Sequence, residues 1–383
     1  MNIRGILNSL RRSLKIKVLL IGGYGNFGKH IAKCLAQEKN IELIIAGRNL
    51  SKAEEFAKSL NAINPAKAAK LDIDNNILES LSQINPNLVI HTSGPYQEQS
   101  YKAAQSCIKQ KCHYVDLADA RKFVNNITSL DSEAKKAGVL ICSGASSVPC
   151  LTSAIIDKYI NEFENLEEIE YGIATAQLTN RGLATTEAVL SYAGKPFKTL
   201  IKGEMQDIYG WLDLSFRKFW NLNNRPLGNC DIPDLELFPK RYPTLKTIRF
   251  KAGLEFKFLH IILLFLSWLV KIGLIKSLQS WAKILLKISF LLDFIGKDDS
   301  GFYMLMKGKD KKSQKKKVMF EIFAKNGDGL YIPSTPAIII AKKFANNEID
   351  EIGAKPCVDI INLDEYLENL SKLNITWRVE KSE

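Results

Sequence analysis

The sequence predicts an α/β fold with a doubly wound parallel sheet, followed by a second α+β domain. Three observations support this prediction. Short apolar segments alternate with amphipathic helical patterns over residues 1–150, a glycine-rich turn follows the first apolar segment, and the alternation stops near residue 150. With 383 residues, the chain is long enough for two domains.

The first strand–turn–helix unit carries the clearest signal. A buried strand is expected at 18–21, and Gly23, Gly25 and Gly28 follow it with the spacing G-x-G-x-x-G before a helical pattern. The first glycine permits a tight turn, the second lets the backbone approach a pyrophosphate, and the third lets helix and strand pack closely. The start of the helix then attracts the anion. The pattern predicts a dinucleotide-binding domain of the Rossmann type, and the alternative is a glycine-rich connection without a ligand.

The other elements of this domain follow in alternation. Further strands are expected at 41–46, 68–72, 87–92, 112–116 and 139–143, and helices at 51–60, 77–81, 97–109 and 129–137. Right-handed crossovers would place the carboxyl ends of all six strands along one ligand crevice.

The end of the second strand indicates which dinucleotide binds. Chains that bind NAD usually carry an acidic residue there for the ribose 2′-hydroxyl. Here the strand ends in Ala46, Gly47, Arg48 and Asn49. A guanidinium group can form paired, charge-assisted bonds with a 2′-phosphate, which an acid would repel. NADP(H) is therefore the predicted cofactor, and the alternative is a solvated surface arginine.

Three later segments supply further candidates for cofactor binding. Asp72 and Ile73 end the third strand, where they could meet the adenine, although Asp72 could equally cap the turn. A Gly-Pro turn follows the fourth strand. Small residues precede residue 147, where they form an anion nest or close the nicotinamide pocket, and the alternative is a plain connection between domains. The expected cofactor-binding residues are Gly23, Tyr24, Gly25, Asn26, Phe27, Gly28, Arg48, Asn49, Asp72, Ile73, Ser93, Gly94, Pro95 and Ser146.

Two residues are candidates for catalysis. Tyr96 could donate a proton or line the substrate pocket, and the alternative is a tyrosine packed at the rim of the sheet. Asp116 ends the fifth strand, so it should face the crevice, where it could orient substrate, act as a base or cap the next helix. His91 lies in an apolar strand and is expected to be a core histidine. The sequence shows no metal-ligand cluster, catalytic triad or P-loop.

Composition limits the partners. The net charge is +12 and the pI about 9.2, but no nucleic-acid-binding motif is present, so we expect anionic cofactors or lipid surfaces as partners. Seven cysteines without a CxxC pair favour a reducing compartment. Residues 1–17 have no long apolar run, which argues against a signal peptide. These features predict a cytoplasmic protein that is either free or peripheral on the inner face of a membrane.

The pattern changes after residue 150. An α+β domain for substrate or interaction is expected at 151–334, with a helix at 150–160, a strand at 168–174, an irregular stretch at 177–243 and a hairpin of 302–307 with 318–324. Residues 335–383 are expected to return to the first domain through helices at 335–346 and 364–372, with a short strand at 357–361 between them. Residues 1–15 form an N-terminal extension.

The segment 256–295 is strongly hydrophobic. It has three interpretations: a buried helical pair, an anchor lying in the plane of a membrane, and a membrane span, which we rank last because Lys271 interrupts the run. If it is an anchor, the lysine-rich turn at 307–317 should lie on the same face and bind an anionic membrane surface. The sequence does not determine the oligomeric state, and a homodimer is compatible with it.

Taken together, GGYGNFG, AGRN, SGPY, YVDLADA and SGASSVPC resemble the saccharopine dehydrogenase-like oxidoreductases, in a bacterial branch whose substrate is unassigned. Later segments, such as CDIPDLELFPKRYP and KAGLEF, extend the resemblance over nearly the whole chain. The saccharopine-forming reductases carry an Asp-Pro-Gly-type segment with a nearby His where this chain reads Ser147-Val148-Pro149-Cys150.

The resemblance implies an NADP(H)-dependent oxidoreductase that transfers hydride to or from an imine or amino-acid adduct, or an activated alkene or carbonyl. The substrate would be a small molecule or lipid-like. The alternative is a non-catalytic, membrane-associated NADP-binding sensor or scaffold.

Overall fold

The computed structural model describes residues 15–382, and its contacts divide the chain into two compact units. Unit 1 comprises the described residues up to Asp119 together with Phe123–Leu151 and Pro333–Ile361. Unit 2 comprises Ala120–Lys122, Thr152–Ile332 and the described residues from Asn362 onward. Apart from Lys15, the expected N-terminal extension lies outside the described residues.

Unit 1 is built on a parallel sheet of seven strands in the order β15-β6-β5-β4-β1-β2-β3. The chain winds outward from β1 in both directions, so the order reverses between β1 and β4, and in such sheets ligands bind beyond the carboxyl ends at this switch point. The strands are β1 (Ile16–Ile21), β2 (Ile41–Gly47), β3 (Lys67–Lys70), β4 (Leu88–His91), β5 (His113–Asp116), β6 (Leu140–Ser143) and β15 (Gly353–Pro356).

Helices cover the sheet because each presents one apolar face to it. One core cluster joins alternate strand residues, such as Leu19 and Val89, to buried residues of α4, α5 and α7, such as Leu81 and Ala134. On the chain's return, α13 packs on α2 and β1. The helices of this unit are α2 (Asn26–Leu35), α3 (Leu50–Ser59), α4 (Ile77–Ile84), α5 (Lys102–Lys109), α7 (Asp131–Ala137) and α13 (Thr335–Ala345), and α6 (Arg121–Asn125) begins among the residues assigned to unit 2.

The seventh strand corrects the expected strand at 357–361. The strand lies four residues earlier, at β15, because Gly353–Pro356 pairs in parallel with β6. Its four residues are too few to show a periodic pattern in the sequence.

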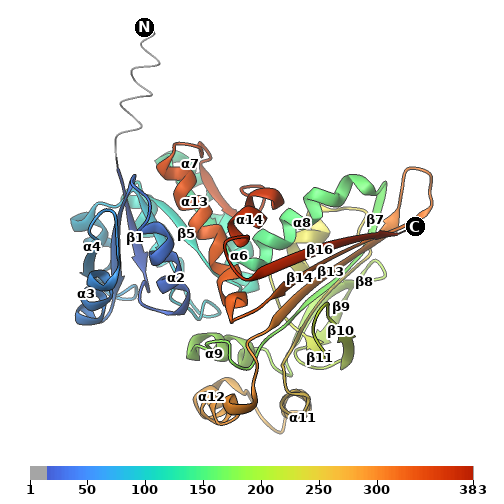
Figure 1. Ribbon diagram of the computed structural model, residues 1–383. Coiled ribbons are helices and arrows are strands. Elements are labelled where there is room, and N and C mark those ends of the chain that lie inside the picture. The colour runs from blue at the N-terminus through green and yellow to red at the C-terminus, as the bar shows by residue number, and fades with distance from the viewer. Residues whose placement is uncertain (1–14, 383) are drawn as a thin grey trace. The chain divides into compact units, whose positions relative to one another are not determined.

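Unit 2 contains a mixed sheet of seven strands in the order β10-β11-β12-β7-β13-β14-β16, and a separate hairpin of β8 and β9. Figure 1 shows β7, β13, β14 and β16 side by side. The strands are β7 (Asn165–Ala174), β8 (Pro196–Ile201), β9 (Glu204–Tyr209), β10 (Ser215–Lys218), β11 (Asn224–Asn229), β12 (Thr247–Gly253), β13 (Ser300–Lys309), β14 (Lys315–Ala324) and β16 (Ile375–Ser382). The helices are α8 (Thr152–Tyr159), α9 (Leu183–Ser191), α10 (Asp234–Arg241), α11 (Lys257–Lys271), α12 (Ala282–Phe290) and α14 (Leu363–Leu370).

Two expectations for this unit are wrong. The stretch 177–243, expected to be irregular, contains two helices and four strands, which are short and depend on pairing partners far away in the chain. Residues 335–383 do not all pack on the first domain, because β16 pairs with β14 over eight residues and α14 contacts α8. The cap of α14 does form as expected, since the Asn362 side chain accepts a hydrogen bond from the backbone N–H of Glu365 at 3.0 Å.

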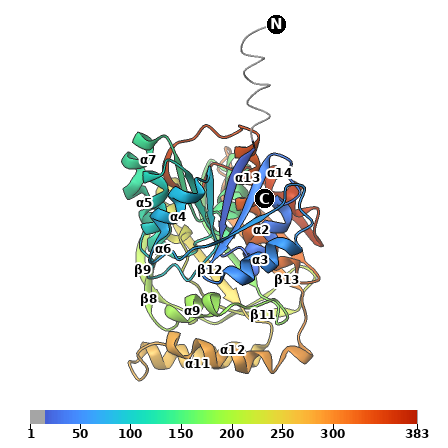
Figure 2. The ribbon, with the colours of Figure 1, turned by 90° about the vertical axis from the view of Figure 1, so that its left-hand side faces the viewer.

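The hydrophobic segment forms α11 and α12, which lie at the same end of unit 2 (Figure 2). Neither these helices nor any other helix in residues 15–382 has the length and hydropathy needed to cross a bilayer. The lysine-rich turn lies at the far end of β13 from α12. Because β13 has ten residues that rise about 3.3 Å each, the turn is about 30 Å from this end of the unit. The expectation that the turn shares a face with 256–295 is therefore wrong.

Candidate dinucleotide site

The glycine turn after β1 is more tightly constrained than its spacing alone indicates. Gly22 adopts φ +77°, so the left-handed position of the turn falls one residue before the G-x-G-x-x-G motif. A Cβ atom on Gly22 would lie 2.5 Å from the Ser93 hydroxyl oxygen, and one on Gly28 would lie 2.2 Å from the Gly22 carbonyl oxygen. Only glycine fits at either position. Sequence reasoning missed Gly22, although it is the first of the two adjacent glycines.

The turn leads directly into the start of α2. The helix begins at Asn26, its N-cap is Gly25, no side chain caps it, and its first turn holds no acidic residue. Gly25 is exposed, so the backbone there is accessible. The first turn of a helix leaves N–H groups without intrahelical partners and carries a partial positive charge. This cradle fits the pyrophosphate of a dinucleotide.

Tyr24 connects the glycine turn to the end of β2. Its hydroxyl accepts a hydrogen bond from the backbone N–H of Asn49 at 3.2 Å. A Cβ atom on Gly47 would lie 2.5 Å from that hydroxyl oxygen, so the ring of Tyr24 occupies the space that a side chain at Gly47 would need. The Asn49 side chain accepts from the N–H of Lys52 at 3.0 Å and so caps α3, which gives it a structural role.

Arg48 is exposed at the carboxyl end of β2 and forms no ion pair with any described residue. Nearby, the Asp72 carboxylate accepts hydrogen bonds from the backbone N–H of Asp74 at 3.1 Å and from the side chain of Asn75 at 2.8 Å. These bonds, with a smaller contribution from the charge of Arg48, lower the pKa of Asp72. Asp72 therefore caps the turn after β3, which matches the second of its two interpretations. Ile73 is partly buried and packs against the core. At the end of β2, the charge of Arg48 is therefore not neutralised by an ion pair with any described residue.

Two side chains that sequence reasoning missed hold the loop after β4. Gln99 donates from Nε2 to the carbonyl oxygens of Ser93 at 2.7 Å and Pro95 at 2.9 Å. Thr92 donates to the carbonyl oxygen of Ile21 at 2.9 Å, which joins the ends of β1 and β4. The half-buried Ser93-Gly94-Pro95 turn is therefore held next to the glycine turn, where the switch point lies.

Tyr96 is packed at the rim of the sheet rather than free to react. Its side chain is 6% exposed, and its hydroxyl donates to the carbonyl oxygen of His91 at 2.8 Å. Burial and the nearby charge of Asp116 raise the pKa of Tyr96 well above its usual value. This geometry matches the packing alternative and gives no support to proton donation.

Asp116 is fully buried, so the expectation that it faces the crevice is wrong. Its Oδ1 accepts hydrogen bonds from the Ser143 hydroxyl at 2.9 Å and from the backbone N–H groups of Gly144 at 2.9 Å and Ala118 at 3.0 Å. Burial raises its pKa to about 6. Asp116 therefore ties the ends of β5 and β6 together as a positioning residue, while its Oδ2 has no hydrogen-bond partner among the described residues.

The backbone N–H of Ser146 also forms a hydrogen bond within the protein. It donates to the Gly144 carbonyl oxygen at 2.7 Å, and the backbone N–H of Ala145 donates to the carbonyl oxygen of Asp116 at 2.7 Å. Neither of these two N–H groups is available for an anion, so an anion nest that includes them does not form. His91 is a core histidine as expected, with burial lowering its pKa to about 4.

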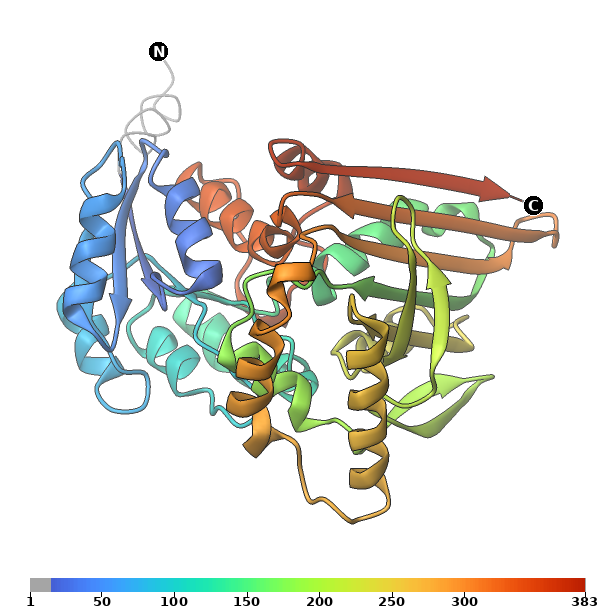
Figure 3. The same cartoon turned by 60° about the horizontal axis from the view of Figure 1, so that its bottom comes forward.

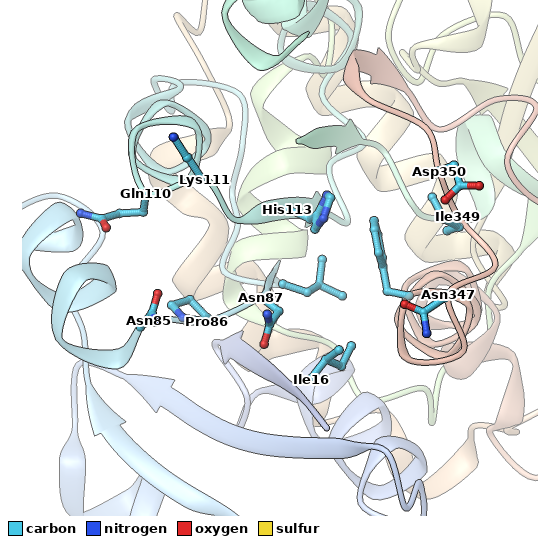
Figure 4. Close-up of a pocket in the computed structure, with 12 residues that line it drawn as sticks. Ile16, Asn85, Pro86, Asn87, Gln110, Lys111, His113, Asn347, Ile349 and Asp350 are labelled. Atoms are coloured by element: carbon cyan, nitrogen blue, oxygen red, sulfur yellow. The ribbon is translucent and has the colours of Figure 1, made fainter. Parts of the chain in front are cut away.

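The hollows found in unit 1 lie away from these residues. One of them, of about 340 Å³, is lined by Ile16, Asn87 and His113, which begin or precede strands, and by Phe344 and Asp350 (Figure 4). It therefore opens at the amino edge of the sheet, opposite the glycine turn. The candidate site is an open cradle of backbone at the carboxyl edge.

Fold and site together define a dinucleotide-binding α/β protein. The family model for the saccharopine dehydrogenase NADP binding domain matches residues 18–142. The first domain of this chain is therefore similar to the NADP-binding domain of saccharopine dehydrogenases, and NADP(H) is its cofactor.

Two known proteins illustrate the relationship. Carboxyaminopropylagmatine dehydrogenase from Synechocystis sp. is 23% identical over 253 residues, which is 62% of this chain and 61% of the relative, so the match spans about three fifths of that protein. The solved structure of saccharopine dehydrogenase (L-Glu forming) from Saccharomyces cerevisiae covers 96% of this chain and 100% of its own, with a TM-score of 0.72 and 14% identity. This second likeness confirms the fold, with its parallel sheet and second mixed sheet.

Proposed function

We propose that the protein is an NADP(H)-dependent oxidoreductase that transfers hydride to or from an amine-linked carbon, as in an imine or amino-acid adduct. The observation that carries the proposal is the uncapped, acid-free start of α2 behind the glycine turn, with the unpaired Arg48 at the neighbouring strand end. When bound, the nicotinamide supplies or accepts the hydride.

Each part of the cradle would hold one part of the cofactor. Gly22, Gly25 and Gly28 would let the backbone approach the pyrophosphate at the start of α2. Arg48 would bind the 2′-phosphate. The Ser93-Gly94-Pro95 turn, held by Gln99, would lie against the ribose and nicotinamide. No proton transfer is assigned to Tyr96, because its hydroxyl donates to a carbonyl oxygen, or to Asp116, because its carboxylate is buried.

The substrate class rests on the name of the Synechocystis relative, which describes agmatine bearing a carboxy- and amino-substituted propyl group, an amine that carries a second substituent. A second candidate class, an activated alkene or lipid-like carbonyl, is favoured by the exposed apolar helices α11 and α12.

Loss of NADPH absorbance tests the proposal on two substrate panels. The first panel pairs amino acids or agmatine with keto acids or aldehydes, and the second contains enals and lipid carbonyls. Turnover with the first panel supports the adduct reaction, and turnover with the second alone transfers the proposal to lipid-like substrates. Tight NADPH binding without turnover on either panel would refute an enzyme of these classes and indicate a non-catalytic sensor or scaffold.

A further inference from the structure

The helix α11 has an inverted amphipathic pattern. The residues it buries are His260, Ser267 and Val270, so two of the three are polar. Its outer face carries large apolar side chains, including Ile262 at 50% and Phe265 at 55% exposure. A helix that covers the core of a water-soluble domain shows the opposite arrangement. The outer face of α11 is therefore suited to a surrounding less polar than water.

The segment after α11 continues the same surface. In α12 the one buried residue is Ala282, while Ile284 is 62% exposed, and beyond the helix Leu291 is 72% and Phe294 83% exposed. More than half of the exposed large apolar side chains in the described residues fall within 258–295. Both helices lie at one end of unit 2 (Figure 3). We call the exposed side chains of 257–295 the α11–α12 patch.

The charge of the patch has one sign. It contains exposed lysines and no acidic residue before Asp293, which pairs with Arg181 at 2.5 Å. None of the patch lysines up to residue 287 forms an ion pair with a described carboxylate. These lysines are Lys257, Lys271, Lys276, Lys283 and Lys287. Their aliphatic stems can lie along an apolar surface while the ammonium groups reach polar headgroups.

We propose that the α11–α12 patch docks on an anionic lipid bilayer, with both helices lying in the plane of its interface. Apolar side chains flanked by lysines match this surface in both hydrophobicity and charge. A second copy of the chain fits less well, because a symmetric contact would place lysines against lysines. With 15 residues, α11 is about 22 Å long, shorter than the roughly 30 Å hydrocarbon core, so it lies in the interface and does not cross it.

Vesicle sedimentation of the full chain tests this docking. Vesicles of phosphatidylcholine with phosphatidylglycerol should bind the protein at low salt, and binding should weaken as salt rises. Reversing two patch lysines in Lys283→Glu/Lys287→Glu should weaken binding by about 30-fold or more. The matched control, Lys311→Glu/Lys312→Glu, makes the same charge change at the distant hairpin turn and should have a small effect.

A second pair of variants separates apolar insertion from simple charge attraction. Phe265→Glu should reduce binding by about 10-fold or more, because one buried aromatic side chain is lost. Phe216→Glu changes a residue of similar exposure, 53%, on β10 and should leave binding intact. The emission of Trp268 should shift to the blue on binding, and Trp268→Phe should remove that part of the shift.

Several results would overturn the proposal. They are failure of the wild type to bind at low salt, equal losses for the two lysine pairs, and equal losses for Phe265→Glu and Phe216→Glu. A dimer in light scattering that Phe265→Glu dissociates, without vesicle binding, would instead assign the patch to a second copy. NADPH affinity and melting temperature report whether each variant is folded, and they also keep this result separate from the proposed reaction.

Discussion

Replacing Arg48 with alanine should weaken NADPH binding and leave NADH binding nearly unchanged, because NADH lacks the phosphate that Arg48 would hold. A charge-assisted hydrogen bond contributes about 1.5–3 kcal/mol. The Arg48 side chain is exposed, so solvent screens the interaction and we expect the lower part of this range. A loss of about 1.5–2 kcal/mol corresponds to roughly 10- to 30-fold weaker binding.

Calorimetric titration of both cofactors measures this difference directly. Arg48→Lys should lose less affinity for NADPH than Arg48→Ala, because it keeps the charge but not the planar fork. Lys39→Ala is the matched control, since Lys39 is exposed and precedes β2 at the opposite edge of the sheet. Equal losses for NADPH and NADH, or a wild type that prefers NADH, would refute the role of Arg48.

Three further predictions concern the site. Gly28→Ala should lower the melting temperature and abolish NADPH binding, since its methyl group would lie 2.2 Å from the Gly22 carbonyl oxygen. In Gly25→Ala the methyl group would lie 3.1 Å from the same oxygen, so this variant should stay folded and lose NADPH affinity. Thermal unfolding with and without NADPH distinguishes the two variants. Tyr96→Phe should cost about 0.5–1.5 kcal/mol of stability, because the buried carbonyl of His91 loses one of its two donors and keeps the N–H of Leu117 at 3.3 Å, with kcat unchanged; a loss of about 10²-fold or more in kcat would restore proton transfer to Tyr96. Because burial raises the pKa of Asp116 from 3.8 to about 6, the folded state binds more protons between these values, so the free energy of unfolding should fall by up to about 3 kcal/mol as the pH rises through them. Urea unfolding of Asp116→Asn should lack this part of the slope, and parallel curves would contradict the assignment.

The parallel sheet of unit 1 could be predicted because its signals are local. The strand before Gly23, the glycine spacing and the helix after it lie within twenty residues, and the same alternation repeats along the chain. The strand β15 could not be found in this way. It has four residues and pairs with β6, which lies more than two hundred residues earlier in the sequence.

For the site, the sequence located the strand ends but not the directions of the side chains. Asp116 does end β5, yet its carboxylate points inward and accepts hydrogen bonds from N–H groups of the following loops. This orientation depends on Gly144, which is distant in the sequence. The role of Gln99 could not be predicted for the same reason. Its amide is oriented by carbonyl oxygens of the loop after β4, and no sequence pattern predicts the shape of that loop. Gly22 is the exception, since two adjacent glycines after a strand already allow the turn to shift by one residue.

The hydrophobic segment shows most clearly what a one-dimensional pattern leaves open. In the sequence, 256–295 supports a buried pair, an interfacial anchor and a span, because all three need many apolar residues. What separates them is the face that each helix turns toward the sheet. Burial of His260 and Ser267 instead of Phe265 argues against a helix pair that hides its apolar face, and the length of α11 argues against a span. The five patch lysines, none of which forms an ion pair with a described carboxylate, then favour a lipid surface over a second copy of the chain, because an anionic lipid surface supplies the opposite charge.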